Sequence, residues 1–314
     1  MIFRSQYYCV TSTELKYIWF ICMKSCNFSY YDPNTVSEVV SLISRHENAK
    51  LLAGGQSLVP MLNFRILSPE HIVDLNKVSD LFGIKENGDH LSIGSMTRQS
   101  ELLNSPLIIQ SSPLISKALG YVGHDQTRNR GTIGGSLCHL DPAAELCVVA
   151  SAYNAELTVT GKKGDRVIAM SDWPIDFLTP ALDHDEILTN IRITPWQDSH
   201  GFCFLEFARR EGDFAIVAVA VLIEIADHII SKASIALGGV AAGPVRLHDV
   251  ETLLKGQSPG QELFKEAGLL AKKVDAMSDV NYSTNYRKRL SGALTERALH
   301  GAMAQFKGEE EGHE

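Results

Sequence analysis

Two short glycine-rich stretches constrain the fold of this chain more than any other feature. They are residues 53–58, with the sequence AGGQSL, and residues 130–136, with the sequence RGTIGGS. Glycine adopts positive φ at little cost and lets another group approach the backbone closely. A turn of this kind can aim successive backbone N–H groups at one point, which creates an anion site. Two such turns with hydroxyl side chains are suited to the two phosphates of one dinucleotide.

A second interpretation of these stretches stays open, because a Gly-Gly pair is also typical of an ordinary tight turn. Neither stretch matches G-x-G-x-x-G or G-x-x-x-x-G-K-[ST], so the sequence does not favour a Rossmann or a P-loop site. No H-E-x-x-H or G-x-S-x-G motif occurs either. The sequence therefore predicts no catalytic side chain and no metal ligand.

The two glycine stretches occur together with PEH at 69–71, Asp74-Leu75 and DPAAE at 141–145. In this order they resemble the FAD-binding medium subunit of molybdenum hydroxylases. That family includes carbon monoxide dehydrogenase, the xanthine dehydrogenase FAD domain and bacterial N-heterocycle hydroxylases. The resemblance runs from about Asn27 to Phe306. It implies an α+β fold: a two-part FAD-binding domain of the PCMH type, like that of vanillyl-alcohol oxidase, followed by a C-terminal domain with a three-stranded sheet and helices.

The predicted domain organisation follows from this resemblance. The apolar patch at 17–22 is too short to span a bilayer, and Met23 opens the part of the chain that resembles the family. We therefore expect an N-terminal extension at 1–22, FAD-binding subdomains at 23–78 and 79–196, a C-terminal α+β domain at 197–307 and a solvated, disordered acidic tail at 308–314.

Hydrophobic periodicity and turn residues predict the individual elements. Thr35 is suited to cap a helix that begins at Val36. Strands are expected at 50–52, 72–75, 156–160, 166–169, 186–193, 202–209, 215–225 and 229–237. Further helices are expected at 113–119, 137–154, 261–277 and 286–306.

The resemblance also implies which residues contact FAD. Glu145 stands where many relatives carry aspartate, so it is either a direct contact or a solvated charge. Leu188 is either a flavin contact or an ordinary core leucine, and Phe214 is either an aromatic ring near the isoalloxazine or a core phenylalanine. Many relatives carry a lysine near the flavin where this chain has LEF at 205–207, which leaves the local charge open. The cofactor-binding residues implied in this way are Ala53, Gly54, Gly55, Gln56, Ser57, Leu58, Thr132, Ile133, Gly134, Gly135, Ser136, Glu145, Leu188 and Phe214.

Charge and cysteine content limit the possible partners. The formal net charge is −8 and there is no long basic run, which argues against nucleic acid as a main partner. The six cysteines show neither C-x-x-C nor any iron–sulfur or zinc spacing, and we expect free thiols in a reducing cytoplasm. If the assembly contains iron–sulfur clusters, another chain must supply their ligands.

The resemblance predicts a cytoplasmic oxidoreductase subunit with non-covalent FAD and no transmembrane segment. It would pass electrons from two [2Fe–2S] clusters on a small chain to an external acceptor, while a large chain would hold molybdopterin cytosine dinucleotide, in a dimer of heterotrimers. Nicotine-like N-heterocycles are the expected substrates of the complex. Two alternatives remain open: a flavin-free scaffold or maturation protein of the same fold, and a self-contained flavin oxidoreductase.

Overall fold

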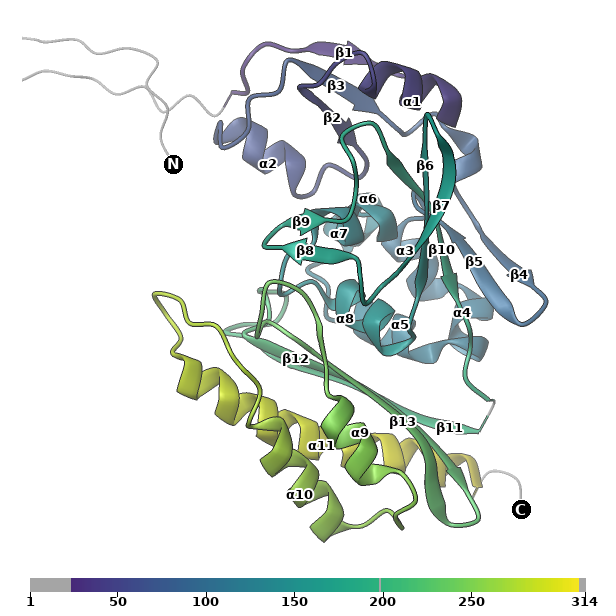
Figure 1. Cartoon of the computed structure of the whole chain (residues 1–314), viewed down its shortest axis with the longest axis vertical. Coiled ribbons are helices and arrows are strands. Elements are labelled where there is room, and N and C mark those ends of the chain that lie inside the picture. Colours follow the sequence, from purple (N-terminus) through teal and green to yellow (C-terminus); the bar gives the residue numbers. More distant parts are fainter. Residues whose placement is uncertain (1–23, 198, 311–314) are drawn as a thin grey trace, which may run out of the picture.

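The computed structural model describes residues 24–197 and 199–310, and its three main sheets follow one another along the long axis (Figure 1). The expected N-terminal extension and residues 311–314 of the expected acidic tail lie outside this range. Gly308–Glu310, which we expected to be disordered, continue the last helix instead. No helix in the described ranges has the length and apolar character needed to cross a membrane.

The first sheet is small and parallel, and it leads directly into the first glycine stretch. Its strands are β1 (Ser29–Tyr31), β2 (Ala49–Leu52) and β3 (His71–Asp74), in the order β1-β3-β2. Helix α1 (Val36–Ile43) begins where the Thr35 hydroxyl accepts a hydrogen bond from the Glu38 N–H at 3.2 Å, as the sequence predicts. Residues 53–57 connect β2 to α2 (Leu58–Asn63), so the glycine pair lies between a strand end and a helix start.

The second sheet is antiparallel and has the order β4-β5-β10-β6-β7. The predicted hairpin at 156–169 is confirmed, because β6 pairs with β7 along its whole length. The strands are β4 (Ile84–Asn87), β5 (His90–Gly94), β6 (Glu156–Gly161), β7 (Gly164–Ala169) and β10 (Ile187–Ile193). A 3₁₀ turn η1 (Ser79–Leu81) precedes this sheet, and a small ribbon of β8 (Pro174–Asp176) and β9 (Thr179–Pro180) follows β7.

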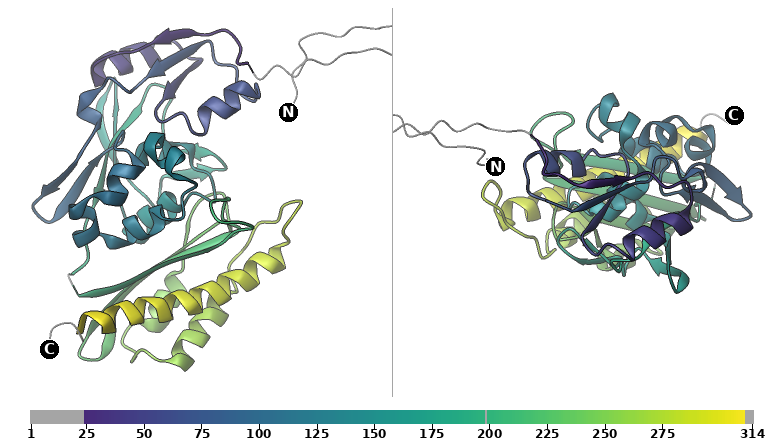
Figure 2. Two further views of the ribbon diagram at one scale, coloured as in Figure 1. Left: turned by 180° about the vertical axis from the view of Figure 1, so that it is seen from behind. Right: turned by 90° about the horizontal axis from the view of Figure 1, so that it is seen from above.

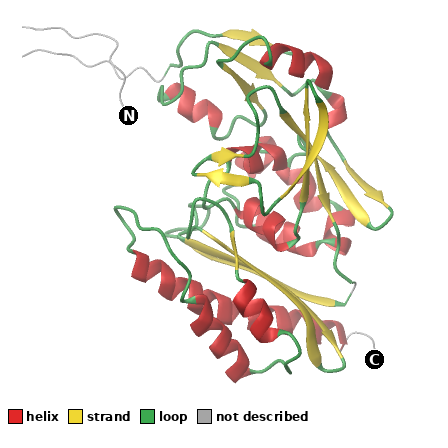
Figure 3. Ribbon diagram, in the orientation of Figure 1, coloured by secondary structure: helices red, strands yellow, loops and turns green. Residues whose placement is uncertain are grey.

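Six helices connect β5 to β6, and Figure 3 shows them beside the second sheet and above the third. They are α3 (Gln99–Asn104), α4 (Pro106–Ser111), α5 (Pro113–Leu119), α6 (Asp125–Arg130), α7 (Ile133–His139) and α8 (Glu145–Ala152). The expected single helix at 137–154 is wrong. Leu140 has φ 51° and ends α7 in the left-handed region, and Pro142 follows before α8 begins.

The third sheet has four strands in the order β11-β12-β13-β14, one more than expected. They are β11 (His200–Phe207), β12 (Val217–Ala226), β13 (Ile229–Gly238) and the two-residue β14 (Val245–Arg246). Helices α9 (His248–Leu254), α10 (Gln261–Ala271) and α11 (Thr284–Glu310) cover one face, and the rear view in Figure 2 shows α11 lying along the sheet. Helix α10 ends before the expected Met277, because Met277 returns to the sheet and donates its N–H to the Val240 carbonyl at 2.8 Å.

This third sheet is buried on both faces, which fixes the middle of the chain to its C-terminal part. Alternate positions such as Phe204, Ala218 and Ala220 belong to the core that includes α5 and α8. The positions between them, such as Val219 and Val221, belong to the core under α10 and α11. The period of two along each strand produces this division.

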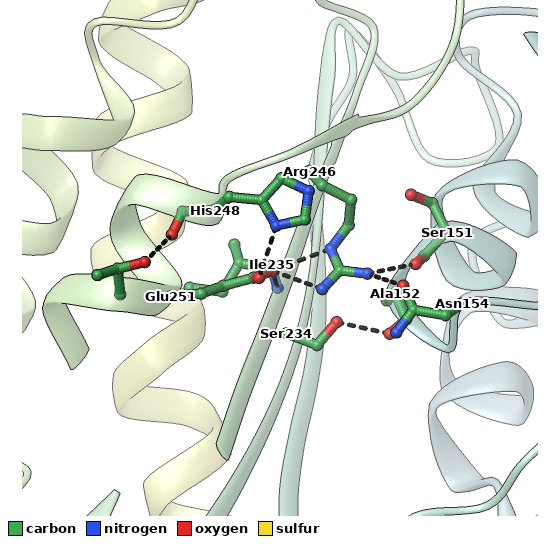
Figure 4. Close-up of polar contacts among 9 residues, drawn as sticks. Ser151, Ala152, Asn154, Ser234, Ile235, Arg246, His248 and Glu251 are labelled. Atoms are coloured by element: carbon green, nitrogen blue, oxygen red, sulfur yellow. Dashed lines mark hydrogen bonds and ion pairs between the residues drawn. The ribbon is translucent and has the colours of Figure 1, made fainter. Parts of the chain in front are cut away.

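A polar network around Arg246 reinforces the same interface (Figure 4). The Arg246 guanidinium donates to the Ser151 carbonyl at 2.8 Å and to the Asn154 side chain, both near the end of α8. It also pairs with Glu251 of α9 at 2.7 Å. The Ser234 hydroxyl donates to the Ala152 carbonyl at 2.5 Å. The last carbonyls of α8 are thus held by side chains of the third sheet.

Candidate functional site

The two glycine stretches, far apart in sequence, lie against each other. A Cβ atom on Gly54 would stand 2.2 Å from the Arg130 carbonyl oxygen, so only glycine permits this contact. A Cβ atom on Gly135 would lie 3.5 Å from the Ala53 Cβ. The structure therefore brings together the implied site residues at 53–58 and 132–136.

The first stretch presents unengaged backbone donors. No described residue accepts a hydrogen bond from the backbone N–H of Gly54, Gly55, Gln56 or Ser57. Gly55 has φ +76°, a conformation that favours glycine, and α2 begins directly after Ser57. Unpaired N–H groups at such a turn are an electropositive surface suited to an anion such as a phosphate.

The second stretch uses its amides inside the protein. The Ile133 N–H donates to the Thr97 carbonyl at 3.2 Å, and the Gly134 N–H donates to the Ser95 carbonyl at 2.8 Å. The Thr132 hydroxyl accepts from the Gly135 N–H at 3.0 Å and caps α7. Gly134 has no positive φ, and a Cβ there would stand 2.6 Å from the Ser95 carbonyl oxygen. This stretch is therefore a close packing contact with residues 95–99.

Two polar side chains that sequence reasoning missed brace the contact between the stretches. Asn76 donates its side-chain N–H to the Ala53 carbonyl at 3.1 Å. The Arg98 guanidinium donates to the Asn76 side-chain oxygen and to the Arg130 carbonyl. Burial, followed by the charge of Arg130, lowers the pKa of Arg98. The one sequence signal that could have pointed to this contact was Asn76, a polar residue directly after a predicted strand.

Glu145 is buried, so the interpretation of a solvated charge is wrong. It is the first residue of α8 and is 9% exposed. Burial raises its pKa to about 7, and the neighbouring Asp141 adds to the rise, while the backbone N–H of Glu145 itself opposes it. A carboxyl group in this setting binds its proton more tightly than an exposed glutamate does.

Leu188 and Phe214 have opposite environments. The Leu188 side chain is 2% exposed and belongs to the core of the second sheet, beside a register shift in the pairing of β10 with β6. Phe214 is 76% exposed, so the interpretation as a core phenylalanine is wrong. Its loop lies against α6, because a Cβ on Gly212 would stand 2.8 Å from the His124 ring. Phe214 thus offers an exposed aromatic ring on a loop that contacts the residue directly before α6.

A cleft of about 730 Å³ is lined by residues of α5, of β11 and of the loop after β11. Glu206, at the sequence position where the charge was left open, forms part of its wall. One carboxyl oxygen of Glu206 is buried and has no hydrogen-bond partner in the described part of the chain. Burial raises the pKa of Glu206 to about 8, with a further contribution from the charge of Glu145. Charged and polar residues that line the same cleft include Lys117, Tyr121, Arg210, Glu211 and Gln305.

The described residues contain no group of three or more His, Cys, Asp or Glu side chains arranged to hold a metal ion. Cys26, Cys138, Cys147 and Cys203 are free thiols, and Cys9 and Cys22 lie outside the described ranges. Burial raises the pKa of Cys147, which keeps that thiol protonated. This part of the chain thus supplies a candidate anion site without a metal centre.

Comparison with known proteins identifies two matching families. The family described as "FAD binding domain in molybdopterin dehydrogenase" matches residues 26–196, and "CO dehydrogenase flavoprotein C-terminal domain" matches residues 202–302. The caffeine dehydrogenase subunit beta of a Pseudomonas species is 35% identical over 88% of this chain and 95% of the relative. The nicotine 6-hydroxylase medium subunit of Paenarthrobacter nicotinovorans is 36% identical over 90% of this chain and 100% of the relative.

Solved structures give the same result at the level of the fold. A chain of carbon monoxide dehydrogenase from Hydrogenophaga pseudoflava superimposes with a TM-score of 0.87 at 31% identity, over 89% of this chain and 98% of that one. A chain of quinoline 2-oxidoreductase from Pseudomonas putida 86 superimposes with a TM-score of 0.86 at 31% identity, over 91% and 99% of the two chains. The similarity therefore covers the FAD-binding part and the C-terminal part together.

Proposed function

Because this chain belongs to the family of FAD-binding medium subunits of molybdenum hydroxylases, we propose that its first glycine stretch binds the pyrophosphate of FAD. The observation that carries this proposal is the row of backbone N–H groups at Gly54–Ser57 that donate to no described residue. The residues present fit the cofactor, since the unpaired N–H groups are donors for phosphate oxygens and the positive φ of Gly55 shapes the turn that carries them. The second stretch, with Asn76 and Arg98, holds the first stretch in shape.

The other site residues have distinct proposed roles. The exposed Phe214 ring would contact the isoalloxazine, and Glu145 would contribute a buried carboxyl to the dinucleotide site. Leu188 contributes through its backbone, since its side chain lies in the core. When bound, FAD supplies the electron-transfer chemistry, and these residues bind and orient it.

The chain acts as one subunit of an oxidoreductase complex in this proposal. Relatives are named medium subunits, medium chains or dehydrogenase complex subunits. We propose a large partner with molybdopterin cytosine dinucleotide and a small partner with two [2Fe–2S] clusters, arranged as a dimer of heterotrimers in the cytoplasm. This chain would hold the FAD that connects the clusters to an external acceptor.

Aromatic N-heterocycles are the proposed substrates of the complex. The caffeine and nicotine relatives are 35% and 36% identical to this chain, whereas the two carbon monoxide dehydrogenase relatives are 31% and 32% identical. The substrate pocket in this arrangement lies in the large partner, so this chain affects electron delivery and not substrate choice.

Coexpression of this chain with the products of its neighbouring genes tests the proposal. We expect a complex that co-purifies, with one FAD per copy of this chain, measured by the ratio of flavin to protein absorbance after release. A folded chain that takes up no added FAD would overturn the proposed function. A flavin-bearing chain that co-purifies with no partner would favour the self-contained flavin oxidoreductase.

A further inference from the structure

One buried arginine joins three loops at one end of the third sheet. Arg287 lies near the start of α11 and is 4% exposed. Its Nη1 donates to the carbonyls of Ile216 and Gly239, and its Nη2 pairs with the Asp279 carboxylate. Ile216 comes directly before β12, Gly239 directly follows β13, and Asp279 lies in the loop before α11. Arg287 therefore holds these three loops together.

The loop that carries Phe214 is fixed where it enters β12. The Ile216 N–H donates to the Phe207 carbonyl at 2.8 Å, which closes the loop between β11 and β12. The Ile216 carbonyl accepts from Arg287, so both backbone groups of Ile216 are engaged. Ala215 and Ile216 are 6% and 4% exposed, whereas Phe214, directly before them, is 76% exposed. The buried pair therefore sets the direction in which the Phe214 ring leaves the surface.

Gly239 connects the same arginine to the turn before α8. The Gly239 N–H donates to the Pro142 carbonyl at 2.7 Å, within the DPAAE stretch at 141–145. Gly239 has φ +75°, and a Cβ there would stand 2.4 Å from the Ile216 carbonyl oxygen. Only glycine thus lets the two carbonyls share one nitrogen of Arg287. Two segments with proposed FAD contacts, the loop before β12 and the stretch before α8, therefore meet at one guanidinium.

The loop before α11 holds this guanidinium in one orientation. Asp279 Oδ1 accepts from the backbone N–H groups of Asn281 and Tyr282 at 2.7 and 2.8 Å, which orients the carboxylate. The Arg287 Cζ lies 5.6 Å from the centre of the Tyr282 ring, within the range of a cation–π contact. The Tyr282 ring in turn stacks on Tyr286 at 5.8 Å. A planar group held in this way has a role that a lysine ammonium cannot reproduce.

We propose that Arg287 is a positioning residue for the flavin site, which holds the loop before β12 so that the Phe214 ring meets the isoalloxazine. It acts through the Ile216 carbonyl and not by touching the cofactor. The flavin part of this inference rests on the proposed function. The fixing of the loop does not, because it follows from hydrogen bonds within this chain.

The first test measures how fast trypsin cuts the loop in the flavin-free full chain, with the fragments identified by mass spectrometry. Arg209 and Arg210 are exposed trypsin sites in this loop, and Lys162 and Lys163 in the turn between β6 and β7 are an internal reference. We expect Arg287→Lys to cut several-fold faster at the two loop sites and at the wild-type rate at the reference sites. Lysine keeps the charge but cannot hold two carbonyls and a carboxylate at once.

Two further variants keep this test decisive. Asp279→Ala removes the carboxylate at a side chain that is 42% exposed, so it should fold and speed loop cleavage by a smaller factor than Arg287→Lys does. Arg246→Lys is the matched control, because Arg246 also joins carbonyls to a carboxylate but holds α8 and not this loop. Its loop should be cut at the wild-type rate. Equal loop cleavage in wild type, Arg287→Lys and Asp279→Ala would overturn the proposal, and so would an equal rise in Arg246→Lys.

The second test measures FAD affinity in a double-mutant cycle of Arg287→Lys and Phe214→Ala, by titration of the flavin-free chain. Each single variant should bind FAD several-fold more weakly. The affinity loss of the double variant should be at least about threefold smaller than the product of the single losses, because a displaced ring leaves no contact to remove. The same cycle with Arg246→Lys is the control, and its losses should multiply.

The outcomes separate this inference from the proposed function. Losses that multiply in the Arg287→Lys cycle would overturn the coupling to the flavin, because a merely stabilising arginine acts independently of the ring. A Phe214→Ala variant with wild-type affinity would overturn it as well. A wild-type chain that takes up no FAD would overturn the proposed function instead, and the trypsin series would still decide whether Arg287 fixes the loop.

Discussion

The two glycine stretches look alike in sequence but have different structural roles. From Gly54 to Ser57 no residue in the described part of the chain accepts a hydrogen bond from the backbone N–H groups, and Gly55 has φ +76°. At 132–136 the amides of Ile133, Gly134 and Gly135 all have internal acceptors. Glycine shapes the proposed binding turn in the first stretch and permits close packing in the second. A glycine motif therefore identifies a site only when the fate of its N–H groups is known.

Gly134→Ala should have the largest effect, because the second stretch is a packing element. The new methyl group would stand 2.6 Å from the Ser95 carbonyl oxygen, and overpacking of this kind costs about 1–3 kcal/mol. We expect the melting temperature of the flavin-free chain to fall by roughly 5 °C in a thermal unfolding scan. Gly120→Ala is the control: Gly120 caps the end of α5 with helical φ and ψ, and a Cβ there would lie 3.3 Å from the Lys117 carbonyl oxygen, so stability should change little. Equal melting temperatures for the two variants would contradict the packing role.

Gly55→Ala should separate binding from folding in the first stretch. Its positive φ costs about 1 kcal/mol or more for alanine, and the turn that aims the N–H groups would distort. We expect FAD affinity to fall at least about tenfold, equivalent to about 1.4 kcal/mol, in a titration of the flavin-free chain. Gly88→Ala, with φ +64° and nothing within 4 Å, is the matched control for backbone strain. It should lose similar stability but keep its FAD affinity; if it also loses affinity, the effect at Gly55 is not local.

Arg98→Lys should weaken the brace between the two stretches by a smaller amount. Lysine keeps the charge but cannot reach both the Asn76 side chain and the Arg130 carbonyl with a planar group. Loss of one such bond costs about 1–2 kcal/mol. We expect a several-fold weaker FAD affinity by the same titration. Arg45→Lys, at the exposed end of α1, is the control, and an unchanged affinity in Arg98→Lys would show that the turns hold their shape without this brace.

The smallest effect is expected from the two hydroxyl groups. Ser57→Ala and Ser136→Ala each remove at most one hydrogen bond to the cofactor, worth about 0.5–1.5 kcal/mol. We expect Ser57→Ala to weaken FAD binding by a few-fold and Ser136→Ala to weaken it less, as judged by the flavin content of the purified variants. A larger effect at Ser136 would reverse the comparison between the two stretches.

The sequence was sufficient to locate the glycine stretches and the order of most elements, because these depend on local patterns. It did not reveal the break at Leu140, whose left-handed φ of 51° is unusual for a leucine. Asn76 and Arg98 could not be assigned either, because their contacts join residues that only tertiary packing brings together. Local signals identify the binding turn, whereas its support comes from long-range contacts.

The attachment of helix α8 to the third sheet has a mechanical consequence. The Pro142 carbonyl, shortly before the first residue of α8, accepts a hydrogen bond from the Gly239 N–H at 2.7 Å, and the last carbonyls of α8 are held by Arg246 and Ser234 of the third sheet. A short helix that is fixed at both ends to one sheet moves together with that sheet. A partner chain that binds the C-terminal domain and shifts its sheet would therefore shift α8, and the Glu145 carboxyl with it, as one body.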